Sequence, residues 1–253
     1  MAEKVQETVE TNEALQRARG FWAKFSRPII YVGSAIILLI GGWFGYKKFV
    51  KEPKELKASE LIFPAEKLFG KMTQLNFSKD SVNIVLNGGV LEGSKVTGLL
   101  SIIKNYGGTA AGNRAQYLTG ACYLNLGEFD KAVKYLKEFD ANGATQIQSK
   151  AYILLGHAYA EQKKTSEALD YYKKAGSVLS DKDAVQKAVA MFTAASYADQ
   201  VGKSKEAIDI LHDLKENHLD GITKKSMTNF QEPAPPVTVD DVDKLLAKLG
   251  ATN

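Results

Sequence analysis

The residues best suited to chemistry in this sequence are three histidines, one cysteine and one glycine-rich stretch. The histidines are His157, His212 and His218. Two histidines hold a metal ion from one helix when they stand at a spacing such as i and i+4. His212 and His218 are six residues apart, and none of the three has a partner at that spacing. We therefore predict no metal site.

Cys122 is the single cysteine, so an intrachain disulfide is impossible. It falls within a helical pattern, which predicts a small buried apolar residue and not a nucleophile. The stretch 87–93, NGGVLEG, lacks the Lys-Ser/Thr pair of a phosphate-binding loop, and no G-x-S-x-G sequence is present. We predict no catalytic residues, no cofactor and no small-molecule substrate, and hence no enzyme.

The charge pattern argues against nucleic acid as a partner. The net charge is only +4, acidic and basic residues are interleaved, and Arg114 is the one arginine after Arg27. Nucleic-acid sites draw on clustered arginine and lysine. With 45% hydrophobic and 25% charged residues, the composition is that of a chain with a packed core.

Residues 28–46 carry no charge and predict a single transmembrane helix. Nineteen residues at about 1.5 Å each span roughly 28 Å, close to the hydrocarbon thickness of a bilayer. Trp22 precedes the segment and Trp43 lies near its end, as at membrane interfaces. The alternatives are a cleaved signal peptide, which the long leading segment and the missing A-x-A site disfavour, and a buried core helix.

Two properties of this segment remain open. Basic residues flank both of its ends, so the positive-inside rule does not decide which side the larger domain faces. Gly41 and Gly45 form a G-x-x-x-G spacing that permits close helix pairing in lipid, although glycine is common in membrane helices anyway.

An internal repeat dominates the remainder of the chain. Residues 113–139 and 149–175 align without gaps at a spacing of 36, and a weaker third copy at 188–214 follows after a further 39. Small residues recur where two helices would cross, and large apolar residues recur at i, i+3 and i+4. The residues predicted to pack the repeats are Gly120, Tyr123, Ala132, Gly156, Tyr159, Ala168, Ala195 and Ala207.

The stretches LTGACYLNLGEFDKA and LGHAYAEQKKTSEA resemble the tetratricopeptide repeat family through the framework G/A…Y…G-x-[FY]-x-x-A. The second copy departs from it with Lys163 in place of the turn glycine, and the third has Ala198 in place of tyrosine. The resemblance implies a tetratricopeptide-type solenoid of helix pairs, because one pair cannot bury its own apolar face. Together with the membrane helix predicted over residues 28–46, the expected fold is all-α, with a single N-terminal transmembrane helix followed by the solenoid.

The resemblance also implies a concave groove lined by the first helix of each pair, suited to an extended chain or a partner helix. The predicted groove residues are Arg114, Tyr117, Asn125, Lys150, His157, Glu161, Phe192, Asp199 and Gln200. Tyr117, Ile153 and Phe192 stand where repeats that grip a C-terminal carboxylate need a basic residue. A chaperone-tail receptor is therefore disfavoured.

The flanking segments complete the predicted organisation. We expect a helix over residues 54–69, a loop after Leu86 and a helix over 95–106, together forming a degenerate first repeat. A helix capped by Thr238 and stopped by Gly250 should close the solenoid. The predicted divisions are 1–27, a short tail; 28–46, the membrane anchor; 47–112, the stem and first repeat; 113–217, three repeats; and 218–253, a linker with the capping helix.

The whole layout, and in particular IIKNYGGTAAGNRAQYLTGACYLNLGEFDKAVKYLKEF, resembles Bacteroidetes members of the YfgM-like family of ancillary Sec translocon subunits. That resemblance implies an inner-membrane protein with a cytoplasmic N-terminus and a periplasmic repeat domain. Its implied partners are Sec translocon subunits, a membrane-anchored periplasmic chaperone and translocating polypeptides. The alternatives are a structural scaffold of another envelope complex and an import-type receptor that faces the cytosol.

Overall fold

The computed structural model describes residues 2–75, 77–91, 93–218 and 237–251. The chain divides into two compact units, one ending at Leu56 and the other beginning at Lys57. The first unit is helical throughout: helix α1 (Ala2–Tyr46) is followed by a π-helical turn, η1 (Lys47–Lys51), and by the start of α2 (Glu52–Leu75).

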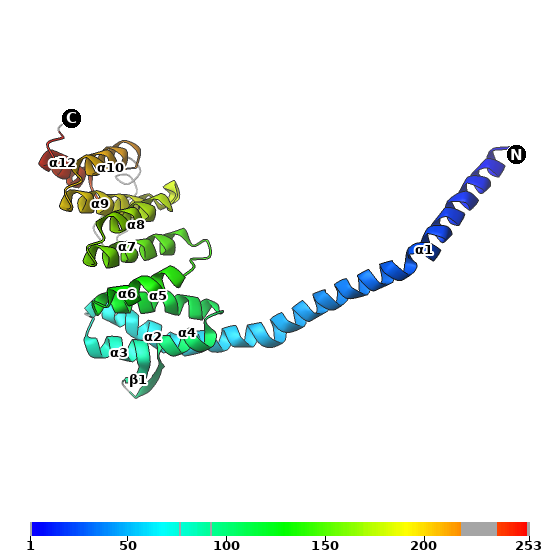
Figure 1. The fold of residues 1–253 in the computed structure, drawn as a ribbon, viewed down its shortest axis with the longest axis horizontal. Helices are drawn as coiled ribbons and strands as arrows, with labels where there is room; N and C mark the ends of the chain where they lie inside the picture. Colours follow the sequence, from blue (N-terminus) through cyan, green and yellow to red (C-terminus); the bar gives the residue numbers. More distant parts are fainter. Residues whose placement is uncertain (1, 76, 92, 219–236, 252–253) are drawn as a thin grey trace. The chain divides into compact units, whose positions relative to one another are not determined.

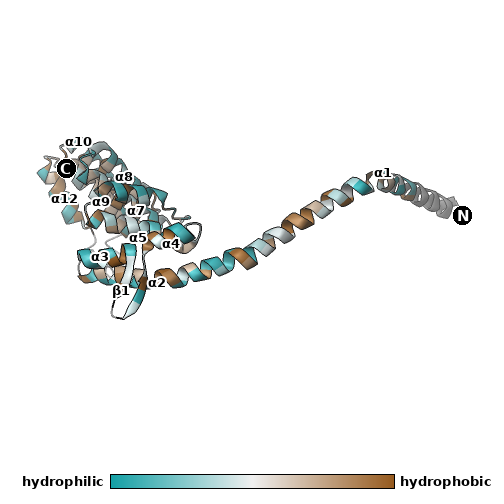
Figure 2. Cartoon of the chain, turned by 60° about the horizontal axis from the view of Figure 1, so that its bottom comes forward, coloured by the Kyte–Doolittle hydropathy of each residue, from teal (hydrophilic) through white to brown (hydrophobic). Residues whose placement is uncertain are grey.

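The first unit contains the candidate membrane span. Among the described residues, one helical stretch, beginning at Ile30, is long and apolar enough to cross a membrane. Its large apolar side chains are uncovered, with Ile37 at 71% and Leu38 at 75% exposure. Figure 2 shows this part of α1 as a largely brown, hydrophobic stretch. Side chains this apolar are stable outside a protein core only where a lipid or another partner covers them.

The second unit begins with helices that pack a core of their own. Ala58, Ile62 and Ala65 of α2 are fully buried against α3 (Lys79–Asn87), α4 (Leu99–Tyr106) and α5 (Ala110–Asn125). Helix α2 is longer than the predicted 54–69 and continues through Pro64.

A β-hairpin corrects the all-α prediction. Strands β1 (Gly88–Leu91) and β2 (Ser94–Thr97) pair antiparallel where the sequence predicted a loop and the start of a helix. Val96 points into the core, and Gly98 is the extended N-cap of α4, so that helix begins at Leu99 and not at residue 95. A Cβ atom on Gly98 would lie 2.3 Å from the Asn87 carbonyl carbon, so only glycine fits where the hairpin closes on α3.

Three antiparallel helix pairs follow and stack in order along the second unit (Figure 1). Each pair packs within itself and against the first helix of the next pair. The pairs are α5 with α6 (Phe129–Glu138), α7 (Thr145–Glu161) with α8 (Thr165–Ser177), and α9 (Ala184–Gln200) with α10 (Ser204–Asn217); a short 3-10 turn, η2 (Asp181–Asp183), precedes α9.

The same turn joins the two helices in every pair. Gly127, Lys163 and Gly202 occupy it with φ of 74°, 59° and 77°. In each case the next residue donates its N–H to a carbonyl five residues back, as Glu128 does to Tyr123 over 2.9 Å. Lys163 therefore adopts the left-handed backbone that a glycine takes in the other two repeats, at a steric cost.

Helix α12 (Val239–Lys248) covers the last pair. Thr238 is its N-cap and forms a reciprocal capping box with Asp241. Val242 and Leu246 of α12 are buried against Leu211 and Leu214 of α10, so the apolar face of the third pair is closed. The segment 219–236, which holds most of the predicted linker, lies outside the described residues.

Candidate protein-binding site

Small residues allow the two helices of a pair to cross closely. The eight predicted packing residues all lie buried: Gly120, Tyr123, Ala132, Gly156, Tyr159, Ala168, Ala195 and Ala207. A Cβ atom on Gly120 would lie 2.5 Å from Cγ of Leu136, and one on Gly156 would lie 2.5 Å from Cε1 of Tyr172. Both distances are below a van der Waals contact, so these glycines set how the paired helices meet.

A cavity of about 480 Å³ lies beside Tyr117 on α5, and we name it the Tyr117 cavity. Its walls are mainly apolar and include Phe139, at the end of α6, and Ile147 of α7. The rings of Tyr117 and Phe139 pack with their centroids 5.4 Å apart. Burial raises the pKa of Tyr117, so its hydroxyl is neutral at physiological pH. The cavity suits an apolar side chain.

Polar contacts fix the rim of the Tyr117 cavity. The Nε atom of Arg114 donates to a Glu66 carboxylate oxygen over 2.7 Å and joins α5 to α2. Asn113 forms two hydrogen bonds with the loop after α6. Its side-chain amide donates to the Asp140 carbonyl, and its Oδ1 accepts from the Asp140 N–H over 2.9 Å. The wall that contains Phe139 is therefore held in place by side-chain bonds to the backbone.

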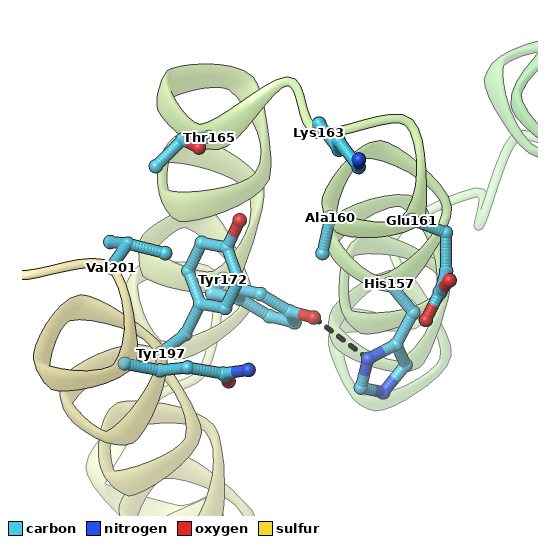
Figure 3. Close-up of a pocket in the computed structure, with 9 residues that line it drawn as sticks. His157, Ala160, Glu161, Lys163, Thr165, Tyr172, Tyr197 and Val201 are labelled. Carbon is cyan, nitrogen blue, oxygen red and sulfur yellow. Dashed lines mark hydrogen bonds between the residues drawn. The ribbon is translucent and has the colours of Figure 1, made fainter.

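A second cavity, of about 440 Å³, is the His157 cavity. It is lined by His157 and Glu161 of α7, Tyr172 of α8, and Tyr197 and Gln200 of α9. The Tyr172 hydroxyl lies 2.7 Å from His157 Nδ1, the contact drawn as a dashed line in Figure 3. Three successive helices thus contribute side chains to one polar site.

The electrostatics keep the His157–Tyr172 pair neutral. Packing against neighbouring atoms lowers the pKa of His157, although Glu161 opposes this shift by favouring the charged imidazolium. Burial raises the pKa of the Tyr172 hydroxyl, with the nearby Tyr197 and Glu161 adding to the effect. At neutral pH the imidazole is therefore uncharged and the phenol keeps its proton.

The structure brings five of the nine predicted groove residues to these cavities. Arg114 and Tyr117 line the first, while His157, Glu161 and Gln200 line the second. The other four line neither. Asn125 donates to the Ala121 carbonyl of its own helix, Lys150 is exposed, Phe192 packs against the third core cluster, and Asp199 forms an ion pair with Lys248 of α12.

Sequence reasoning missed most residues of the two cavities, among them Glu66, Phe139, Tyr172 and Tyr197. Glu66 comes from a helix outside the aligned repeats, so no repeat register could place it. Tyr172 did carry a signal, because the aligned first copy has Leu136 at that position and only a tyrosine adds a polar group. When only the hydrophobic periodicity is used, a residue at this position of the second helix is assigned to the core, whether it is leucine or tyrosine.

Metal binding finds no support in the side-chain arrangement. Over the part of the chain that the structure describes, no group of three or more His, Cys, Asp or Glu side chains is placed to hold an ion. Cys122 is fully buried, and burial raises the pKa of its thiol to about 12. A thiol in that state is a poor nucleophile and a poor ligand.

Two segments match tetratricopeptide-repeat models: residues 114–142, which lie in α5, α6 and the loop after them, and residues 149–175, within α7 and α8. The chain contains tetratricopeptide repeats. The two matches do not extend to α9 and α10, where Ala198 replaces the tyrosine of the other copies. No curated protein and no solved structure matches the chain significantly. Tetratricopeptide repeats form protein–protein interaction domains, and residues of the matched repeats line both cavities.

Proposed function

We propose that this protein is a membrane-anchored protein-binding subunit that assists polypeptides as they emerge from the Sec machinery. In this proposal α1 holds the protein in the inner membrane with its N-terminus in the cytoplasm, and the repeats work in the periplasm. The partners are Sec translocon subunits, a membrane-anchored periplasmic chaperone and the translocating chains. The likeness of the sequence to the YfgM-like family supports this choice of partners.

One observation carries the binding role: two cavities occur on consecutive tetratricopeptide repeats, and each is lined by the first helix of its repeat. The Tyr117 cavity offers aromatic and aliphatic walls, whereas the His157 cavity offers hydrogen-bonding groups. A partner segment that alternates apolar and polar side chains would find a subsite for each kind. Aromatic walls with a polar surround are typical of protein interfaces.

The membrane topology is tested by protease treatment of intact cells and of cells with an opened outer membrane. We expect digestion of the repeat domain only after the outer membrane is opened. Protection that lasts until the inner membrane is also broken would place the repeats in the cytoplasm. That result would overturn the Sec proposal in favour of a cytosol-facing receptor.

The binding site is tested by photo-crosslinking in cells that hold a secreted protein arrested in the channel. A photoreactive amino acid replaces Tyr117 in the full-length chain, and a matched control replaces Asp170, which is exposed on α8 and lines neither cavity. We expect crosslinks from position 117 to the arrested chain or to channel subunits.

The proteins crosslinked to position 117 distinguish the Sec proposal from a structural scaffold. A fixed set of other envelope proteins at position 117 would indicate a structural scaffold. Identical products from positions 117 and 170 would show that the Tyr117 cavity is not the binding site. Crosslinking suits this position better than a double Tyr117→Ala and Phe192→Ala variant, because Phe192 packs against the core and its loss would also lower stability.

A further inference from the structure

The second repeat differs from its neighbours at two positions that meet in space. A hydrogen bond between the side chains of His157 and Tyr172 joins its first helix to its second. The corresponding pairs in the first and third repeats are Ala121 with Leu136 and Ser196 with Leu211. Leucine fills the core at that position with at most 2% exposure. The tyrosine hydroxyl is thus an addition that core packing does not require.

Gly156 makes this contact possible. Three atoms of the Tyr172 ring lie within 3.0 Å of where a Cβ atom of residue 156 would stand. The ring therefore rests directly on the backbone of α7, and its hydroxyl reaches the next residue, His157, over 2.7 Å. Figure 3 shows the Tyr172 hydroxyl directed at the His157 imidazole.

With the Tyr172 hydroxyl as the donor, the contact fixes which imidazole nitrogen carries the proton. Tyr172 keeps its proton because burial raises its pKa, so its hydroxyl can donate to Nδ1. A neutral imidazole that accepts at Nδ1 carries its one proton on Nε2. The imidazole and the Tyr172 ring meet in an edge-to-face arrangement and His157 is exposed, so Nε2–H is available as a donor in the cavity.

An acceptor lines the same cavity as this donor. Glu161 lies one helical turn after His157, its side chain is on the same side of α7, and both line the cavity (Figure 3). The remaining charge in the cavity walls is Lys163, in the turn that follows, and Gln200 of α9 adds a neutral amide. The face of α7 therefore presents one neutral donor and one anionic acceptor side by side.

A primary carboxamide fits this pair better than a charged group does. Its carbonyl oxygen accepts from His157 and its NH₂ group donates to Glu161, so both sites are satisfied. A carboxylate would be repelled by Glu161, and an ammonium group would leave Nε2–H without an acceptor. A ligand that displaces water from one of these groups without replacing its hydrogen bond loses binding free energy.

We propose that the His157 cavity binds the carboxamide side chain of a glutamine or asparagine in a bound polypeptide, through His157 and Glu161. Tyr172 is the positioning residue that keeps His157 in its Nε2–H form. This inference rests on the proposed protein-binding function and adds the side-chain class that one subsite selects.

The ligand class is tested by nuclear magnetic resonance on the full-length protein in detergent, labelled with ¹⁵N-histidine. The chain has three histidines, so the His157 signals are assigned by their loss in His157→Ala. The probes are propionamide, propionate and propylammonium, which match the side chains of glutamine, glutamate and a short lysine. We expect saturable shifts of the Nε2 resonance with propionamide, at about fivefold or more higher affinity than with the two charged probes.

Two variants test the acceptor. Glu161→Ala should weaken propionamide binding by about fivefold. Glu167→Ala removes an exposed carboxylate of α8 that does not line the cavity and should change nothing. Tighter binding of propionate would make this an anion site and overturn the inference, as would the absence of a shift with all three probes.

The role of Tyr172 is tested by Tyr172→Phe, which keeps the ring and removes the hydroxyl. We expect the Nδ1–H form of His157 to appear and propionamide affinity to fall, with helicity preserved. Tyr197→Phe, in the same cavity, is the control and should leave the tautomer unchanged. An unaltered tautomer in Tyr172→Phe would refute the positioning role. Because these readouts need no protein partner, they can fail while crosslinking at position 117 succeeds, and the reverse.

Discussion

Replacing Gly156 by alanine places a single methyl group where the helices of the second repeat cross. The new Cβ atom would lie 2.5, 2.6 and 2.9 Å from three atoms of the Tyr172 ring. Because the ring is rigid, its three atoms cannot avoid the new methyl group independently of one another. Either the whole ring or helix α8 therefore has to move. The same movement would pull the Tyr172 hydroxyl away from His157, which it contacts at 2.7 Å.

Two opposing effects set the size of the change. Alanine is favoured over glycine within a helix by about 1 kcal/mol. Overpacking a close contact costs about 1–3 kcal/mol, and three contacts below 3.0 Å place this site near the upper end. The net expectation is a loss of about 2 kcal/mol. For a domain of this size, that lowers the unfolding midpoint by about 4–8 °C.

Gly70 provides a matched control on α2, in the same unit of the chain. No heavy atom lies within 4 Å of where its Cβ would stand. Gly70→Ala should therefore show the helix preference alone and stabilise the domain by about 1 kcal/mol. Far-UV circular dichroism of the full-length protein in mild detergent, followed during heating, measures both variants. Opposite shifts of the midpoint are the expected result.

The contacts at Gly120 add a graded comparison. There a Cβ atom would meet Leu136, whose side chain can change rotamer more easily than a ring can shift. Gly120→Ala should therefore destabilise the domain less than Gly156→Ala does. If Gly156→Ala melts at or above the wild-type temperature, the close crossing of α7 and α8 and the seating of Tyr172 described above are wrong.

Three further outcomes are expected. Cys122 should resist maleimide labelling in the folded protein and react after denaturation, because burial raises its pKa to about 12; rapid labelling of folded protein would contradict that burial. Thr238→Ala should destabilise α12 by about 1 kcal/mol, since its hydroxyl accepts from the Asp241 N–H, and faster hydrogen exchange confined to α12 would show it. Lys173 holds the pKa of Glu206 in the folded protein below its ordinary value. The stability that this ion pair contributes is therefore fully present above the pKa of Glu206 in the unfolded chain, and it is lost as the pH falls through the lower pKa of the folded protein. The difference in unfolding free energy between wild type and Glu206→Gln should thus vanish in acid. A difference that grows in acid would contradict this prediction.

Much of the repeat architecture could be predicted from the sequence because it depends on local, periodic features. The spacing of Gly120 and Gly156 and of the alanines opposite them is a property of one helix packing on the next. The turns at Gly127 and Gly202, and the N-cap at Thr238, depend on residues within one turn of the chain. The apolar run in α1 depends on composition alone.

The hairpin and the cavities could not be predicted in the same way. The strands β1 and β2 are short, and their pairing depends on how Gly98 closes against α3, which no helical period reveals. Among the groove predictions, Phe192 belongs to a core cluster and Asp199 is paired with Lys248, a residue 49 positions away in α12. Such contacts follow from which helices become neighbours.

The sequence by itself therefore determined the repeating helix pairs, the close crossings within them and the apolar N-terminal helix, because each is encoded over a few adjacent turns. The tertiary structure alone decided which side chains share a cavity. Tyr172 illustrates the physical reason: its ring fills a core position that its neighbours fill with leucine, and only the close approach of α7 and α8 at Gly156 brings its hydroxyl to His157.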